Sequence, residues 1–148
     1  MPGVSVNIDF AELQELAADF KKRGGNLEGV TEVIAADLAA AVEENFERER
    51  GHEQGKWPAL AKSTLKKMSP RRRASSFKIL RDTGALAGSI TPYSDGLVAE
   101  AYTNVPYAKY HTSKLPRTKI RLRDFLDVDI DKVMKDTAEL LLAEVIPP

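Results

Sequence analysis

The chain has 148 residues, of which 43% are hydrophobic and 30% are charged, so it holds enough material for one domain over residues 1–148 with a single core. Because there is no cysteine, disulfide frameworks, thiolate zinc sites and a cysteine nucleophile are excluded. The two histidines, His52 and His111, are too few for a polyhistidine metal centre. No apolar run approaches the roughly 18 residues that a membrane-spanning helix needs, and the first residues do not resemble a secretory signal. We therefore expect a protein that resides in a reducing compartment and is not inserted in a membrane.

The formal net charge of zero conceals a strong segregation of charge along the chain. Residues 1–50 hold 11 acidic and 5 basic side chains, residues 51–123 hold 4 and 15, and residues 124–148 hold 7 and 2. Two basic windows, 62–81 and 107–123, contain no acidic residue. Three interpretations remain open: neutralisation within one molecule, pairing of unlike faces of two subunits, or contact with a phosphate backbone.

The first third of the chain predicts two helices. Asp9 is placed to cap the first, Glu12 completes a capping-box pattern, and Gly24-Gly25 ends the helix. The second runs from about Leu27 to Arg50 and ends at Gly51. Apolar side chains recur along it every four residues, which indicates one buried stripe: Val30, Ile34, Leu38, Val42 and Phe46.

The middle of the chain predicts less regular structure. Residues 51–56 are typical of a loop, and Trp57 either anchors that loop on the core or contacts another subunit. Ser63 or Thr64 is placed to cap a short basic helix. A proline and an arginine run then indicate a mobile loop near residues 66–76.

The last part predicts a hairpin between helices. Thr83 is placed to cap a short helix that reaches about Ser89, and strands near 89–93 and 97–103 flank a Ser94-Asp95-Gly96 turn. A strand-like segment then leads to His111. The fold class is therefore α+β, with two N-terminal helices, a small antiparallel sheet with a hairpin, and a C-terminal helix.

The connection to that C-terminal helix is a mobile basic loop near residues 111–123. A further strand is expected over 125–128, followed by a closing helix capped by Asp129. This helix carries six apolar residues: Ile130, Val133, Met134, Leu140, Leu141 and Val145.

Catalysis is poorly supported. Asp82-Thr83-Gly84 resembles the triplet of aspartic proteases, but a second copy and a glycine-rich flap are missing, and helical spacing follows it. A triad of Asp82, His111 and Ser113 lacks a nucleophile elbow. His52 lies in a polar loop that is too sparse for a metal site. We therefore expect a protein that is not an enzyme and that binds no metal, cofactor or small-molecule substrate.

Several short motifs, taken in order and spacing, resemble those of the phage virion morphogenesis family, the Mu-like tail-completion group, which is distantly similar to tail-to-head joining proteins. The resemblance spans roughly residues 8–146. The motifs are Asn45-Phe46-Glu47-Arg48 leading to Gly55-Lys56-Trp57-Pro58-Ala59-Leu60, Ser63-Thr64-Leu65-Lys66-Lys67, Leu80 to Leu86 with Ser89-Ile90, Tyr107-Ala108 with His111, and Arg123-Asp124-Phe125-Leu126.

Two positions depart from the family pattern. The family usually has a glycine shortly after the histidine, where this chain has Thr112-Ser113-Lys114, and a proline before the Phe-Leu pair, where it has Asp124. Both departures lie in the second basic loop, so the conformation and contacts of this loop transfer least from the family.

The resemblance implies a structural protein that completes the head-proximal end of a phage or prophage tail, or the neck, and lets head and tail join. It would assemble in the host cytoplasm, form a ring of copies with six as the natural expectation, and contact tail or neck proteins, with only incidental DNA contact. The alternative is a nucleic-acid-binding accessory protein that uses the basic loops 62–81 and 107–123.

Two groups of residues follow from these interpretations. The hypothetical partner-binding residues are the cations of the two loops: Lys66, Lys67, Arg71, Arg72, Arg73, Lys114, Arg117, Lys119 and Arg121. The expected structural anchors are Phe46, Trp57, Leu60, Leu80, Thr83, Gly84, Leu86, Tyr107, His111 and Phe125.

Overall fold

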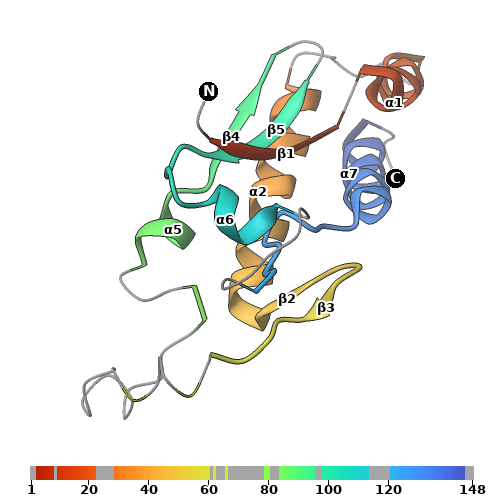
Figure 1. The fold of residues 1–148 in the computed structure, drawn as a ribbon. Helices are drawn as coiled ribbons and strands as arrows, with labels where there is room; N and C mark the ends of the chain where they lie inside the picture. Colours follow the sequence, from red (N-terminus) through yellow and green to blue (C-terminus); the bar gives the residue numbers. More distant parts are fainter. Residues whose placement is uncertain are drawn as a thin grey trace.

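The computed structural model of the chain is an α+β fold in which one long helix packs against a small antiparallel sheet, as predicted (Figure 1). The residues it describes are 3–8, 10–22, 29–60, 62, 66, 79–80, 84–95, 98–113 and 121–145. The helices are α1 (Phe10–Lys22), α2 (Val30–Arg48), α5 (Ala85–Gly88), α6 (Lys109–Thr112) and α7 (Ile130–Val145). The strands are β1 (Val4–Ile8), β2 (Arg50–Gly51), β3 (Gly55–Lys56), β4 (Thr91–Ser94) and β5 (Ala99–Thr103).

The sheet has the strand order β1-β5-β4, and both pairings are antiparallel. The predicted hairpin is confirmed as β4 and β5, and the Asp95 carboxylate accepts a hydrogen bond from the Val98 amide in the turn. Along β5, side chains alternate between buried and half-buried. Its buried residues, Ala99, Ala101 and Thr103, therefore share one face, and α2 is the helix that packs against this strand.

The first strand was not predicted. Val4, Val6 and Ile8 alternate with polar residues, a pattern typical of a strand, whereas the first predicted element was a helix. In the structure β1 pairs with β5 along its whole length, from Val4 opposite Thr103 to Ile8 opposite Ala99. The helix that follows, α1, is confirmed, while its expected cap, Asp9, lies outside the described residues.

Helix α2 is the main core element, and the predicted apolar stripe along it is buried at all five positions. Its expected end at Gly51 is wrong, because the helix ends at Arg48 and Glu49 adopts the left-handed conformation. Gly51 instead belongs to a two-stranded hairpin, β2–β3, where a loop was expected. The backbone amide of Trp57 donates to the Glu49 carbonyl at 2.8 Å and continues this pairing.

Two expectations in the last third also need correction. Residues 125–128, expected as a strand, form a turn and irregular backbone, and the carbonyls of Phe125 and Asp127 accept hydrogen bonds from the Asn45 side chain instead of a strand. The segment before His111 forms a turn that leads into α6, where a strand-like segment was expected. On α7, the apolar side chain of Leu140 is 54% exposed.

The expected caps of two helices have different outcomes. The N-cap residue of α5 is Gly84, whose φ of 77° is left-handed, and not the expected Thr83, which lies outside the described residues. Asp129 caps α7, since its carboxylate accepts a hydrogen bond from the Lys132 amide at 3.1 Å. The buried Thr137 hydroxyl then donates to Asp37 and ties α7 to α2.

The two basic loops lie mostly outside the described residues. Of the stretch from 61 to 78, Lys62 and Lys66 are described, and both are helical and exposed. Of the loop predicted near 111–123, the two ends are described: Thr112 ends α6, and Arg123 is hydrogen-bonded and buried.

Candidate partner-binding surface

Three aromatic rings join α2 to the two segments that flank the basic loops. The Phe46 ring stacks on Phe125 with 5.0 Å between centroids, and the edge of Trp57 meets Phe46 at 5.8 Å. All three side chains are buried. Trp57 is therefore an anchor within the described fold, as the simpler of its two interpretations predicts.

A polar network beside these rings holds the β2–β3 hairpin. Asn45 on α2 donates to the carbonyls of Phe125 and Asp127, both at 3.0 Å. The Asp127 carboxylate accepts hydrogen bonds from the amides of Glu53 and Gln54, both at 2.8 Å. Two amides at the tip of the hairpin thus find acceptors from a segment more than 70 residues away.

The Gln54 side chain at the tip of the hairpin also bonds to the backbone of residues 122–124. Its side-chain amide donates to the Leu122 carbonyl at 2.6 Å, and its carbonyl oxygen accepts from the Asp124 amide at 2.9 Å. Because both of its polar atoms are used, Gln54 fixes the backbone of the segment that leaves the second basic loop.

Arg123 ties the two basic windows together. Its side chain is buried and donates to the carbonyls of Pro58 at 3.0 Å and Ala59 at 3.1 Å, and its amide donates to the His111 carbonyl at 3.0 Å. Burial, and then the positive charge of Arg121, lower the pKa of Arg123 below its usual value. The guanidinium stays charged in this position because carbonyl oxygens face it.

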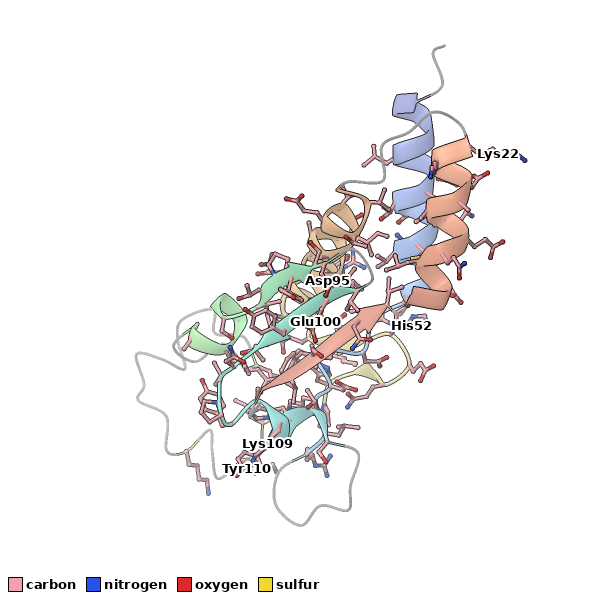
Figure 2. The ribbon with its side chains drawn as sticks, turned by 90° about the horizontal axis from the view of Figure 1, so that it is seen from above. Lys22, His52, Asp95, Glu100, Lys109 and Tyr110 are labelled. Carbon is pink, nitrogen blue, oxygen red and sulfur yellow. The ribbon has the colours of Figure 1, made fainter. Side chains whose placement is uncertain are left out.

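These contacts place the start of the first basic window and the segment that contains the second in one region of the molecule. The first window begins just after Pro58 and Ala59, and the second begins near His111 and ends at Arg123. Figure 2 shows Lys109 and Tyr110 at this end, opposite Lys22 on α1. The Lys109 ammonium lies 5.4 Å from the centre of the Tyr110 ring.

The predicted partner-binding cations are only partly described. Lys66 and Arg121 are described, and both are exposed, as a binding role requires. The others lie outside the described residues, and they are Lys67, Arg71, Arg72, Arg73, Lys114, Arg117 and Lys119.

The expected anchors divide into four groups. Phe46, Trp57, Leu86 and Phe125 are buried, whereas Leu60, Leu80, Gly84 and His111 are half-buried. Tyr107, expected as an anchor, is instead 45% exposed and meets the His111 ring edge-on with 6.5 Å between centroids. Thr83 lies outside the described residues.

The polar residues that hold this region together were not predicted as anchors. Asn45 and Arg123 lie within the motifs of the family resemblance, whereas no motif or periodicity in the sequence pointed to Gln54 and Asp127. Arg123 was counted with a basic loop because its window holds no acidic residue. Its burial depends on contacts with residues about 65 positions away, which composition cannot reveal.

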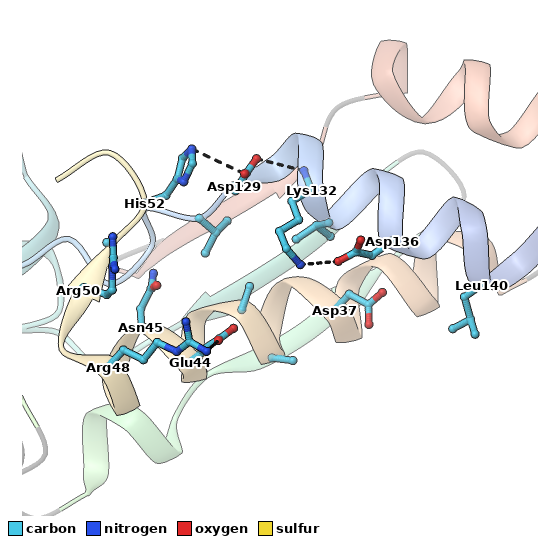
Figure 3. A pocket seen from close by; sticks show the side chains of 15 residues that line it. Asp37, Glu44, Asn45, Arg48, Arg50, His52, Asp129, Lys132, Asp136 and Leu140 are labelled. Atoms are coloured by element: carbon cyan, nitrogen blue, oxygen red, sulfur yellow. Dashed lines mark hydrogen bonds and ion pairs between the residues drawn. The ribbon is translucent and has the colours of Figure 1, made fainter. Parts of the chain in front are cut away.

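A groove lies between α2, α7 and the β2 strand, with a volume of about 720 Å³ (Figure 3). Its apolar lining consists of small or aliphatic side chains: Ala40, Ala41, Val128, Val133 and Leu140. Its charged lining is mixed in sign: Asp37, Glu44, Arg48, Arg50, His52, Asp129, Lys132 and Asp136.

Ion pairs within single helices lie along this groove. Arg48 pairs with Glu44 at 2.7 Å, and Lys132 pairs with Asp136 at 2.6 Å. The hydrogen bond with Asp136 is the main cause that raises the pKa of Lys132 above its ordinary value. His52 Nε2 lies 3.8 Å from the Asp129 carboxylate.

Of the residues considered for catalysis, the structure describes His111, which lies in α6, and Ser113, which follows this helix. Asp82 and Thr83 lie outside the described residues, and helix α5 follows the triplet, as the helical spacing predicts. Among the described residues, no three His, Cys, Asp or Glu side chains gather where they would hold a metal ion. None of the described helices has the length and apolar character needed to cross a membrane.

The fold and this surface define a small α+β domain that keeps its basic and acidic residues in different parts of the chain. A family model, the phage virion morphogenesis family, matches residues 8–142, which is nearly the whole sequence. The chain therefore belongs to the phage virion morphogenesis family, and the resemblance seen in its motifs is confirmed. No curated protein and no solved structure matches it.

Proposed function

We propose that this protein completes the head-proximal end of a phage tail, or the neck, and so enables head and tail to join. Membership of the virion morphogenesis family supports a structural or assembly role in a phage particle. The observation that supports this surface as the partner-binding one is the set of Arg123 contacts, which bring the start of the first basic window next to both sides of the second basic loop. Two basic segments that leave the fold side by side suit binding to a large partner.

Assembly into a ring is part of the same proposal. The exposed side of α2 carries Glu43, Glu44 and Glu47, while the two basic windows lie elsewhere in the chain. Unlike faces on one subunit favour contacts in which each copy meets a different face of its neighbour, and such contacts close into rings. Tail tubes commonly have six-fold symmetry, so six copies is the expected number.

The proposed role is structural and not catalytic. It requires surfaces that bind other proteins of the tail or neck, and it requires no catalytic residue, cofactor or small-molecule substrate. A particle-bound location in the tail or neck follows from the same proposal.

Charge reversal of the arginine run tests it. Arg71→Glu, Arg72→Glu and Arg73→Glu are introduced together into the phage or prophage, and infectious particles are counted while unjoined heads and tails are examined by electron microscopy. We expect unjoined heads and tails to accumulate, because a reversed charge repels the surface that the wild-type run binds.

The chain offers a matched control in another run of three cations, Lys21-Lys22-Arg23, whose first two members are exposed at the end of α1. Reversal of this run should leave the particle yield unchanged. Full yield from the arginine variant, with the purified variant folded as judged by circular dichroism, would contradict the proposal.

Nucleic-acid binding is the second candidate, favoured by the two acid-free windows. Gel-shift titration of the purified chain with duplex DNA at two salt concentrations separates the candidates. A DNA-binding protein would retain specific binding at physiological salt and lose affinity steeply as salt rises. An assembly protein should show no specific binding there.

A further inference from the structure

We propose that the groove between α2 and α7 receives the basic stretch 62–78 of a second copy of this chain. The inference rests on the proposed ring and names the two surfaces that would meet in it. The groove is the receiving surface, and it is built entirely from described residues of α2, β2, the 128–129 segment and α7.

The groove has the shape and lining of a docking surface. Ala40 is exposed and Ala41 is half-buried, so α2 presents a low floor on which another backbone can approach closely. Leu140, which is 54% exposed, extends the apolar lining at the far end of α7 (Figure 3). A partner that lies across this floor would bury an apolar side chain that the described fold leaves in water.

The carboxylates of the groove are available to a new cation. Glu44 and Asp136 are paired within their own helices, to Arg48 and Lys132, and all four side chains are 54–69% exposed. Exposed pairs of this kind contribute little to stability, so Arg48 and Lys132 can release their carboxylates to an incoming cation. An incoming guanidinium would bind a carboxylate through two parallel hydrogen bonds, which the lysine ammonium cannot do.

The stretch 62–78 has the complementary chemistry. Seven of its residues are lysine or arginine and none is acidic. Its two described members, Lys62 and Lys66, are both exposed. Acidic residues beside the groove add to the attraction, because Glu43 and Glu47 are exposed on the neighbouring surface of α2.

The arrangement of the elements favours a second copy as the source of this stretch. The chain returns to the described fold at Ile79–Leu80, shortly before α5. Helix α5 lies on one side of α2 and α7 lies on the other (Figures 1 and 2). Surfaces on opposite sides of one helix suit a contact that repeats from copy to copy and closes a ring.

A synthetic peptide of residues 62–78 tests the groove. The receptor is the full chain with Arg71→Glu, Arg72→Glu and Arg73→Glu, so that its own stretch cannot compete, and binding is followed by fluorescence anisotropy of the labelled peptide. Adding Glu44→Lys and Asp136→Lys to the receptor should weaken binding at least ten-fold. The matched control, Glu32→Lys with Glu139→Lys, makes the same charge change on the same two helices outside the groove and should leave the affinity unchanged.

Equal losses in the groove and control receptors would mean that the peptide senses only overall charge, and this would overturn the proposal. Failure of the peptide to bind at millimolar concentration would overturn it as well. Neither result affects the particle assay of the arginine run, so failure of the groove and failure of the proposed function are distinguishable.

Cross-linking identifies which copy supplies the stretch. Because the chain has no cysteine, Ala40→Cys on one copy and Ala74→Cys on another can be mixed and oxidised without background. We expect a covalent dimer of the two different chains, and a much lower yield when Ala36→Cys, an exposed alanine one turn earlier on α2, replaces Ala40→Cys. A third variant carries both substitutions on one chain; if this variant forms a cross-link within single chains while the mixture of singly substituted chains forms no covalent dimer, the stretch belongs to the same molecule and the proposal is contradicted.

Discussion

Arg123 is a buried cation whose hydrogen bonds connect two stretches of backbone, so its removal should act on stability. In Arg123→Met, the side chain keeps most of its apolar length while the Pro58 and Ala59 carbonyls lose their donor. We expect the free energy of unfolding to fall by about 2 kcal/mol, the usual loss for hydrogen bonds to a charged group. Urea unfolding followed by the fluorescence of Trp57 measures it.

Arg121 gives the matched comparison, because it is the exposed arginine two residues earlier. Arg121→Met should change the free energy of unfolding by no more than about 0.5 kcal/mol, as is usual for surface substitutions. Equal losses for the two variants would show that net charge, and not the carbonyl contacts of Arg123, sets the effect.

Gly51 is a position where a methyl group has no room. A Cβ there would lie 2.6 Å from Asp127 Oδ2 and 3.2 Å from the Asp124 carbonyl oxygen. Gly51→Ala must therefore displace the carboxylate that holds the β2–β3 hairpin, and we expect a loss of about 1–3 kcal/mol in the free energy of unfolding.

Gly88 serves as the control for Gly51. It lies at the end of α5 with open space where its Cβ would be, so Gly88→Ala should stabilise the chain by about 0.5 kcal/mol or more. Thermal unfolding of the two variants side by side tests the prediction, and a gain of stability for Gly51→Ala would refute it.

At the scale of elements, the start of α7 depends on a single cap. The Asp129 carboxylate accepts from the Lys132 amide, so Asp129→Ala leaves that amide without its side-chain acceptor. We expect a loss of about 1 kcal/mol, which corresponds to a fall of about 3 °C in Tm for a chain of this size. Asp129→Asn retains a good cap residue and should lose much less, and calorimetry of both variants decides between a cap and a charge effect.

Elements with strong local periodicity were predictable, and those held by distant contacts were not. Helix α2 showed a four-residue apolar repeat, and all five of those side chains are buried. The β2–β3 hairpin has only two residues in each strand and depends on Asp127, so no local sequence pattern predicted it. The strand β1 did carry a local signal, the alternation of Val4, Val6 and Ile8, but the capping-box pattern at Asp9 favoured a helix as the first element.

At the scale of the whole molecule, composition predicted the charge segregation but not its geometry. The windows 62–81 and 107–123 follow directly from the sequence. The start of the first window lies beside the second loop because of hydrogen bonds made by the side chains of Arg123, Gln54 and Asp127. The partners of these side chains are about 65 or more residues distant. The same limit applies to the groove between α2 and α7, since the packing of two helices far apart in the sequence sets its lining.

If opposite charges bring the copies together, self-association must weaken as salt rises. The Debye length falls from roughly 10 Å at 0.1 M salt to 3 Å at 1 M, so attraction between exposed surfaces is progressively screened. We expect the dissociation constant, measured by sedimentation velocity, to rise by roughly ten-fold or more between 0.05 and 0.5 M sodium chloride. The folded chain should be much less sensitive, because the exposed Arg48–Glu44 and Lys132–Asp136 pairs each contribute little to stability. Association that strengthens with salt would instead indicate that apolar contact, centred on Leu140 and the floor of the groove, brings the copies together.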